Sequence, residues 1–273
     1  MFSGRPARIL RSFDGPGGMS LRDAYVDLVL GGSCVGCAHP GRLLCPRCRT
    51  TLPTSARVAM PRPAPPGLVA AYAAGSYEGL LQQLVIGLKE RRLLGLARPL
   101  GELLALSVVQ AIAQGSTAYA AGPLPRRPLV LVPVPSRPAS VRARGLDSTA
   151  AITARAALLL RRGGLVVRPA QLLRTRPGVA DQAGLDAAAR AANLAGSMTL
   201  PAPGLRRLAR RTPQADVVIC DDVLTTGSTA REAQRALEAV GLTVVAIAAV
   251  AATSRRTSST RSGPGISSGP GLA

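Results

Sequence analysis

VVICDDVLTTGST, residues 217–229, is the stretch of the sequence that most strongly indicates the fold. Its first four residues are apolar, which is typical of a short strand buried on both faces, and a helical pattern follows from Gly227 to Val240. Two carboxylates, Asp221 and Asp222, stand where this strand ends. In open α/β sheets, ligands bind beyond the carboxyl ends of the strands. We therefore expect a ligand site at this position.

The loop between this strand and the helix is suited to a phosphate group. Gly227 permits a positive φ or a close approach of the ligand, and backbone N–H groups at a helix N-terminus attract anions. The acids suit sugar hydroxyls or a divalent metal near a phosphate, and at a strand end we expect solvent or ligand to solvate both. A helix-capping turn with solvated acids is the alternative. The loop also offers the hydroxyl groups of Thr225, Thr226, Ser228 and Thr229.

Strands alternate with helices along most of the chain. Short apolar runs at 128–135, 215–222 and 242–252 predict buried strands. Helical patterns at 79–114 and 144–164 lie between them, the first broken at Pro99 and Gly101, the second capped by Ser148 or Thr149 and ended by Gly163. Such alternation predicts a parallel sheet with helices on both faces.

Four cysteines form a second motif, C-x2-C-x7-C-x2-C. Two such pairs complete a tetrahedral shell of four thiolates, which is typical of a structural zinc site with no open position for a catalytic water. Disulfides and a redox pair are the alternatives, and a cytoplasmic protein with two pairs favours neither. His39 is read as an exposed loop residue, with replacement of one thiolate as the alternative, and the fifth cysteine, Cys220, is read as a buried strand residue. The predicted ligands are Cys34, Cys37, Cys45 and Cys48.

Composition limits the classes of function. Of the 273 residues, 47% are apolar and only 2% aromatic, which argues against aromatic stacking platforms for single-stranded nucleic acid. The net charge is +20, and Lys89 is the one lysine among 34 basic residues. A basic surface for polyanions and the arginine-rich codon usage of a GC-rich genome both account for this charge. No apolar run reaches the ~18 residues of a membrane span and residues 1–20 lack a signal-peptide core, so we expect a cytoplasmic protein.

The strand, both acids, the Thr-Thr-Gly loop and the helix together resemble the phosphoribosyl pyrophosphate (PRPP) motif of type I phosphoribosyltransferases. The resemblance implies that Asp221 and Asp222 face the ribose 2′- and 3′-hydroxyls, and that Mg²⁺ accompanies PRPP. It assigns Asp221, Asp222 and Arg137 to catalysis. The residues that it assigns to PRPP binding are Asp221, Asp222, Val223, Thr225, Thr226, Gly227, Ser228, Thr229, Val134, Pro135, Ser136, Arg142 and Arg144.

The turn after the strand at 128–135 stands where the pyrophosphate loop of such enzymes lies. Its arginines suit pyrophosphate because a guanidinium binds phosphate oxygens in pairs. A later stretch resembles the flexible cover that excludes water in these enzymes. For this cover, or hood, the resemblance singles out Arg174, Gln182 and Arg190.

The order of the motifs is similar to the ComF family, whose members are linked to DNA uptake in competent bacteria. The similarity includes paired cysteine knuckles, a helix ending in Lys89, a Pro-Val-Pro strand end and the PRPP motif. It implies a small zinc-knuckle module before a phosphoribosyltransferase-like α/β domain. The expected organisation is a disordered segment at 1–18, the knuckle module at 19–60, the α/β domain at 66–251 and a disordered tail at 252–273, with a proline-rich linker at 51–67.

Three functions remain open at this stage. Under the first, the chain is a Mg²⁺-dependent phosphoribosyltransferase with an unknown nitrogen acceptor. Under the second, it senses PRPP without catalysis. Alternatively, it is a partner of DNA or of the DNA-uptake machinery through its basic surface. The third function is compatible with either of the first two.

Overall fold

The fold is built on one six-stranded sheet. A computed structural model describes residues 32–114, 127–136, 141–142, 145–176, 196–212 and 214–253. The strand order is β1-β2-β8-β7-β3-β4, and every neighbouring pair is parallel except β1 and β2. These strands are β1 (Arg57–Val58), β2 (Ala71–Ser76), β3 (Leu129–Pro133), β4 (Val167–Pro169), β7 (Asp216–Leu224) and β8 (Thr243–Ala252). The predicted parallel sheet is confirmed.

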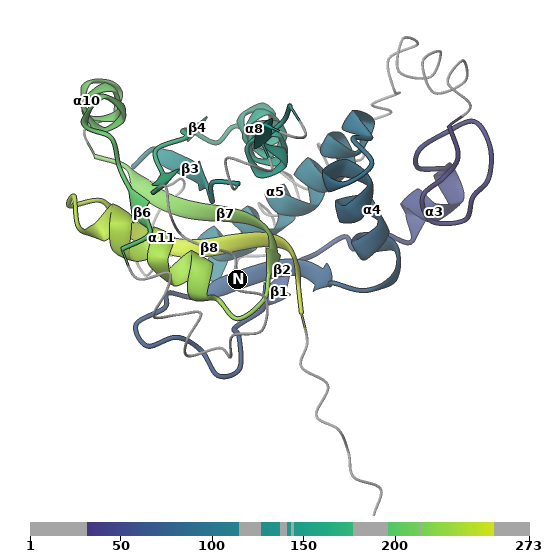
Figure 1. The fold of residues 1–273 in the computed structure, drawn as a ribbon, viewed down its shortest axis with the longest axis horizontal. Helices are drawn as coiled ribbons and strands as arrows, with labels where there is room; N and C mark the ends of the chain where they lie inside the picture. Colours follow the sequence, from purple (N-terminus) through teal and green to yellow (C-terminus); the bar gives the residue numbers. More distant parts are fainter. Residues whose placement is uncertain are drawn as a thin grey trace, which may run out of the picture.

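Helices cover both faces of this sheet (Figure 1). Three of them pack on one face: α4 (Gly79–Lys89), α5 (Ala97–Gln114) and α8 (Ser148–Arg162). On the other face lies α11 (Ser228–Glu238). The residues from Val217 to Cys220 of β7 alternate between these two apolar layers, because side chains in a strand point to opposite faces. The central strands are buried on both sides, which explains their continuous apolar runs.

The remaining elements lie around these layers. A short 3₁₀ helix, η1 (Leu94–Leu96), connects α4 to α5. β5 (Arg174–Thr175) and β6 (Met198–Thr199) form a separate antiparallel pair. The helix α10 (Ala202–Arg211) lies at one end of the molecule, and α3 (Pro46–Thr50) lies at the other (Figure 1).

The predicted helix break at Pro99 and Gly101 is wrong, because α5 runs through both residues. The first helix ends at Lys89, ten residues earlier than the proline. Proline is tolerated in the first turn of a helix, where its missing N–H has no helical partner in any case. Gly101 allows α5 to pack closely on α8, since a Cβ there would lie 2.5 Å from the Cβ of Arg155 and 3.2 Å from the carbonyl oxygen of Ile152.

The N-cap of α8 also differs from the prediction. Asp147, rather than Ser148 or Thr149, caps this helix, and its side chain accepts a hydrogen bond from the backbone N–H of Ala150 at 3.1 Å. The residue order LDST offers three consecutive capping side chains, and only the tertiary contacts select one. Ser148 and Thr149 then become helical residues buried beneath the sheet edge.

In the part of the chain that the structure describes, one helix is long and apolar enough to cross a membrane by length and composition, Leu94–Gln114. In the fold, 72% of its most apolar window is buried. Its side chains contact the sheet and α8, so its apolar composition is that of a core helix.

Candidate functional site

The two carboxylates at the end of β7 have different surroundings. Asp221 is half-buried, and its Oδ1 accepts a hydrogen bond from the backbone N–H of Asp222 at 2.8 Å. Asp222 is only 3% exposed. The prediction that both acids are solvated is therefore wrong for Asp222. The strand continues to Leu224, so Asp222 still lies within the sheet.

A buried ion pair holds Asp222. Its Oδ2 lies 2.6 Å from Nζ of Lys89, the last residue of α4. The same oxygen accepts a hydrogen bond from Oγ1 of Thr149, in the first turn of α8, at 3.3 Å. Three elements that are distant in sequence thus meet at one carboxylate. Sequence reasoning placed Lys89 in a family pattern but did not assign it to the site.

Electrostatics also distinguish the two acids. Burial raises the pKa of Asp221 to about 8, and the negative charge of Asp222 adds to this shift, while Lys89 opposes it. Cys220, the residue before them, is fully buried as expected, and burial raises the pKa of its thiol. The edge of the sheet therefore contains a carboxyl group that gains or loses its proton near neutral pH.

The loop after β7 has the shape expected of a phosphate site. Gly227 has a φ of +77° and is the N-cap of α11. A Cβ at this position would lie 2.9 Å from Cγ of Pro61, so both the backbone conformation and the close packing require glycine. Oγ1 of Thr226 lies 3.1 Å from Oγ of Ser228 and accepts a hydrogen bond from its backbone N–H at 3.4 Å. The hydroxyl groups and the helix N-terminus thus lie together.

The end of β3 lies beside β7, with which it pairs in parallel. The backbone N–H of Val134 donates to the carbonyl oxygen of Cys220 at 2.8 Å. Oγ of Ser136 donates to Oδ1 of Asp147, the N-cap of α8, at 2.9 Å. Pro135 is half-buried and Arg142 is exposed. Two further residues predicted for this loop, Arg137 and Arg144, lie outside the described residues.

The predicted hood is described only at its base. Arg174 is exposed in β5 and pairs in register with Thr199 of β6. The other two hood residues, Gln182 and Arg190, lie outside the described residues.

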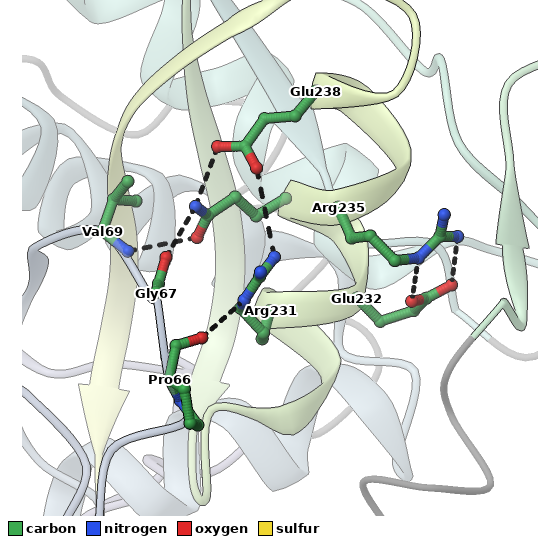
Figure 2. A network of polar contacts seen from close by, with 8 residues as sticks. Pro66, Gly67, Val69, Arg231, Glu232, Arg235 and Glu238 are labelled. Atoms are coloured by element: carbon green, nitrogen blue, oxygen red, sulfur yellow. Dashed lines mark hydrogen bonds and ion pairs between the residues drawn. The ribbon is translucent and has the colours of Figure 1, made fainter.

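The base of this region is fastened to α11. Glu232 accepts a hydrogen bond from the backbone N–H of Met198 at 2.9 Å, and Arg235 donates to the carbonyl oxygen of Met198 at 3.2 Å. Figure 2 shows the paired side chains of Glu232 and Arg235, which are 2.7 Å apart. Burial alone would raise the pKa of Glu232, but hydrogen bonds from Arg235 and from backbone N–H groups lower it below its usual value.

The opposite side of α11 holds the proline-rich segment that the sequence suggested as a linker. Arg231 donates to the carbonyl oxygen of Pro66 at 2.9 Å (Figure 2). Gln234, 3% exposed, donates to the carbonyl oxygen of Gly67 at 2.9 Å and accepts from the N–H of Val69 at 3.1 Å. The segment is therefore part of the packing around the phosphate loop, and α11 is fixed from both sides.

The four knuckle cysteines come together in space. Their sulfur atoms all lie within 4.8 Å of one another, and His39 is exposed and outside this group. A tetrahedral zinc site with Zn–S bonds of about 2.3 Å needs sulfur atoms about 3.8 Å apart. Cys37 Sγ and Cys45 Sγ are 3.6 Å apart, so the cluster fits a metal such as zinc.

The four-cysteine cluster (Cys34, Cys37, Cys45 and Cys48) favours a thiolate at Cys34 and disfavours one at Cys48. Burial opposes ionisation of Cys34, but N–H groups from Cys45, Gly36 and Cys37 lower its pKa to about 6. Burial and the other three cysteines raise the pKa of Cys48 to about 12. A cation shared by four sulfur atoms resolves this competition for negative charge, because metal binding displaces the thiol protons.

The cluster is docked on the helix that carries Lys89. A Cβ on Gly36, in the first knuckle, would lie 2.6 Å from Cδ1 of Leu80 in α4. A Cβ on Gly87, near the end of α4, would lie 3.5 Å from Cγ1 of Val35. Glycines at both contact points allow the knuckle backbone and α4 to pack closely.

Comparison with known proteins supports one class for the α/β domain. Residues 174–264 match the family model of the phosphoribosyl transferase domain. The match includes β7, its two carboxylates, the loop and α11, but not α4, α8 or β3, which complete the site. Together with the parallel sheet, it supports a type I phosphoribosyltransferase-like fold with a four-cysteine cluster at its N-terminal side. No curated protein matches the chain significantly.

Proposed function

We propose that this protein binds PRPP with Mg²⁺ at the carboxyl end of β7 and transfers the phosphoribosyl group to a nitrogen acceptor. The observation that carries the proposal is the carboxylate pair near the end of β7, followed after a short loop by a left-handed glycine at a helix N-terminus. This arrangement offers acceptors for sugar hydroxyls beside donors for a phosphate. The proposal includes the predicted division into a knuckle module at 19–60 and a domain at 66–251, and a cytoplasmic location.

Within this proposal, the carboxylate pair recognises the ribose and the loop recognises the 5′-phosphate. The 5′-phosphate would accept hydrogen bonds from the backbone N–H groups and hydroxyls of Thr225, Thr226, Gly227, Ser228 and Thr229. The pyrophosphate, which carries Mg²⁺, would lie toward the end of β3. Arg137, Arg142 and Arg144 are the cations proposed to contact it, since guanidinium groups bind phosphate oxygens in pairs.

The chemistry needs little proton transfer from the protein. The bond between C1 and the pyrophosphate oxygen breaks, a bond from C1 to the acceptor nitrogen forms, and the acceptor proton leaves to solvent. Positive charge develops on the ribose ring and negative charge on the departing pyrophosphate, so fixed cations and Mg²⁺ stabilise the transition state. Carboxylates near the ring complement its developing positive charge.

Measuring whether bound PRPP is consumed distinguishes catalysis from sensing. We expect PRPP to be consumed and pyrophosphate released only when Mg²⁺ and one member of a panel of bases and amines are present. Calorimetric binding of PRPP without consumption by any acceptor would favour a sensor. An absence of PRPP binding by wild-type protein with Mg²⁺ would refute the proposed site.

A second candidate function, in the manner of the ComF family, is binding of DNA by a basic surface. It is favoured by α10, in which Arg206, Arg207, Arg210 and Arg211 are exposed and line a hollow of about 330 Å³ with Pro203. The helix contains no acidic residue. Its leucines are buried or half-buried, so the arginine face lacks the exposed apolar residues of a membrane-surface helix. The DNA backbone is therefore the polyanion that this face suits.

Salt dependence tests this second function. Four arginine–phosphate contacts predict a slope of log K against log [salt] of about −3.6 for duplex DNA and about −2.8 for single strands. Replacing the four arginines of α10 by glutamine should remove this slope. A matched variant with Arg47, Arg91, Arg161 and Arg162 replaced, four other exposed arginines, loses the same charge. Equal losses in both variants would indicate a general charge effect and no DNA site on α10.

A further inference from the structure

The chain's only lysine lies against the buried carboxylate of the proposed site. Lys89 is one lysine among 34 basic residues, and its Nζ is 2.6 Å from Oδ2 of Asp222. The lysine side chain is 31% exposed and that of Asp222 is 5% exposed. The pair thus extends from the edge of the site into the protein. An ammonium is a compact point charge, whereas the planar guanidinium of arginine favours contacts with two oxygens.

The surroundings of each acid follow from its contacts. Asp222 lies on the side of β7 that faces α4 and α8, because its Oδ2 contacts Lys89 and Thr149. Asp221 is the more exposed of the two acids, and its Oδ1 accepts a hydrogen bond from the backbone N–H of Asp222. Asp222 is therefore enclosed by protein, while Asp221 is the acid with solvent-accessible surface.

The negative charge of PRPP explains why Asp222 is paired with Lys89. PRPP carries several negative charges, and two unpaired carboxylates would repel it. Lys89 neutralises Asp222, and the raised pKa of Asp221 leaves that acid largely protonated near pH 7, so neither carboxyl group adds an uncompensated charge to the free site. Stability alone is a weak explanation, because a buried ion pair is seldom more favourable than apolar residues of similar volume.

We infer that Lys89 is a positioning residue: it neutralises Asp222 and holds this carboxylate toward α4 and α8, so that Asp221 is the acid that faces the ribose hydroxyls. The inference rests on the proposed function and divides the tasks of the two acids, which the sequence resemblance treats alike. Thr149, which donates to the same oxygen of Asp222, supports this orientation.

Two sugar phosphates that differ by one hydroxyl test the inference. We expect calorimetry to show that wild-type protein prefers ribose 5-phosphate to 2-deoxyribose 5-phosphate by about 10- to 150-fold, the effect of one hydrogen bond to a charged group. Asp221→Ala should abolish this preference, and Asp222→Asn should retain most of it. Lys89→Met should weaken ribose 5-phosphate and reduce the preference, because the unpaired Asp222 no longer keeps its orientation.

Variants that restore the sugar preference distinguish a positioning role of Lys89 from a general loss of structure. Lys89→Arg, which keeps the charge, and the double variant Lys89→Met with Asp222→Asn, which removes both charges, should each recover much of the preference. Arg91→Met is the matched control, since Arg91 is an exposed basic residue two positions further on. It should bind both sugars as the wild type does.

The ion pair is also measurable without a ligand. Because the chain has one lysine, ¹⁵N-lysine labelling gives one side-chain Nζ resonance, and Asp222→Asn should shift it more than Asp221→Asn. If wild-type protein binds neither sugar phosphate, the proposed function fails and the inference falls with it. If wild-type protein binds and discriminates while Lys89→Met leaves the preference unchanged, or Asp222→Asn alone abolishes it, only the inference is overturned.

Discussion

The four-cysteine cluster and the carboxyl end of β7 are built in opposite ways. The cluster takes all four ligands from residues 34–48, and within 32–53 only Cys34 and Cys45 are buried. The β7 site joins Lys89, Thr149 and Asp222, which come from two helices and a central strand of the sheet. The first region depends on short-range sequence and a metal, and the second depends on the whole fold.

The largest effect is expected from removing the metal. With so few buried apolar residues, the knuckle draws its folding free energy from metal binding, which in small zinc modules is about 10–16 kcal/mol. We expect one zinc ion per chain, and its loss in Cys45→Ser. Hydrogen exchange should then show that residues 32–53 lose protection on chelation while β7 and β8 keep theirs.

The control for this prediction is Cys220→Ser, which changes a cysteine of the sheet core. It should keep the zinc ion although it lowers stability, because Cys220 is fully buried and outside the cluster. If residues 32–53 stayed protected without metal, the module would be stabilised by its contacts with α4 and the contrast between the two regions would disappear.

A smaller effect is expected at the loop after β7. Thr226→Val keeps the side-chain shape and removes the hydroxyl that lies beside Ser228. If this hydroxyl binds the 5′-phosphate, the loss is about 1.5–3 kcal/mol, or roughly 10- to 150-fold in affinity. Binding should weaken without vanishing, because the backbone N–H groups remain. Calorimetry with ribose 5-phosphate measures it.

Free pyrophosphate is the control ligand for this loop. It should bind Thr226→Val as well as it binds the wild type, since its proposed contacts lie near the end of β3. A variant that weakened pyrophosphate and spared ribose 5-phosphate would mean that the two phosphate subsites are reversed.

The same contrast explains how much of the fold and of the site could be predicted from the sequence. The thiols were identified by spacing alone, because two knuckles fix their own geometry over fifteen residues of chain. The strands were identified because runs such as LVLVP and VVIC are apolar without alternation, which only a sheet covered on both faces explains. The acids and Gly227 followed from their place between such a strand and a helix.

Contacts between distant elements were not predictable. Nothing in the sequence near Lys89 indicates that α4 ends beside Asp222, since this depends on how α4 packs between the knuckle and the sheet. For the same reason Asp147, rather than its neighbours, became the cap of α8, and Pro99 entered a helix rather than ending one. α10 has a strong arginine pattern but had no prediction, because its short length and few apolar residues resemble a solvated loop.

The pH dependence of stability sharpens the description of the β7 site. The pKa of Asp221 is about 8 in the fold, well above its ordinary value, so the folded protein binds a proton that the unfolded chain releases. This bound proton stabilises the folded state. Its contribution to the free energy of unfolding is fully present below about pH 4 and is lost as pH rises toward 8, at no more than about 1.4 kcal/mol per pH unit. Relative to wild type, Asp221→Asn should therefore become more stable between pH 5 and pH 8. Urea unfolding at both values measures it.

The charged and titratable groups nearest to Asp221 are Asp222, Lys89 and Cys220. Asp216→Asn, at the other end of β7, is a control that removes a carboxylate away from this edge. A stability difference between Asp221→Asn and wild type that stayed constant from pH 5 to pH 8 would contradict a raised pKa. The carboxylate would then be charged in the free site.

The smallest effect on the free energy of unfolding is expected from an ion pair between the knuckle and a helix of the α/β domain. Arg49 of α3 lies 2.5 Å from Glu102 of α5, with side chains 44% and 18% exposed. Exposed ion pairs contribute about 0–1 kcal/mol, and Glu102 keeps a second cation, Arg98, at 3.5 Å. Arg49→Ala should therefore change the free energy of unfolding by less than about 1 kcal/mol, and less still in high salt, with the zinc content unchanged. The close packing of Gly36 on Leu80 and of Val35 near Gly87 is apolar and unaffected by salt, so it should keep the knuckle on α4. A double-mutant cycle with Glu102→Gln isolates the pair. A coupling of several kcal/mol, or loss of zinc from Arg49→Ala, would mean that a surface charge rather than this packing holds the metal module against the helix that carries Lys89.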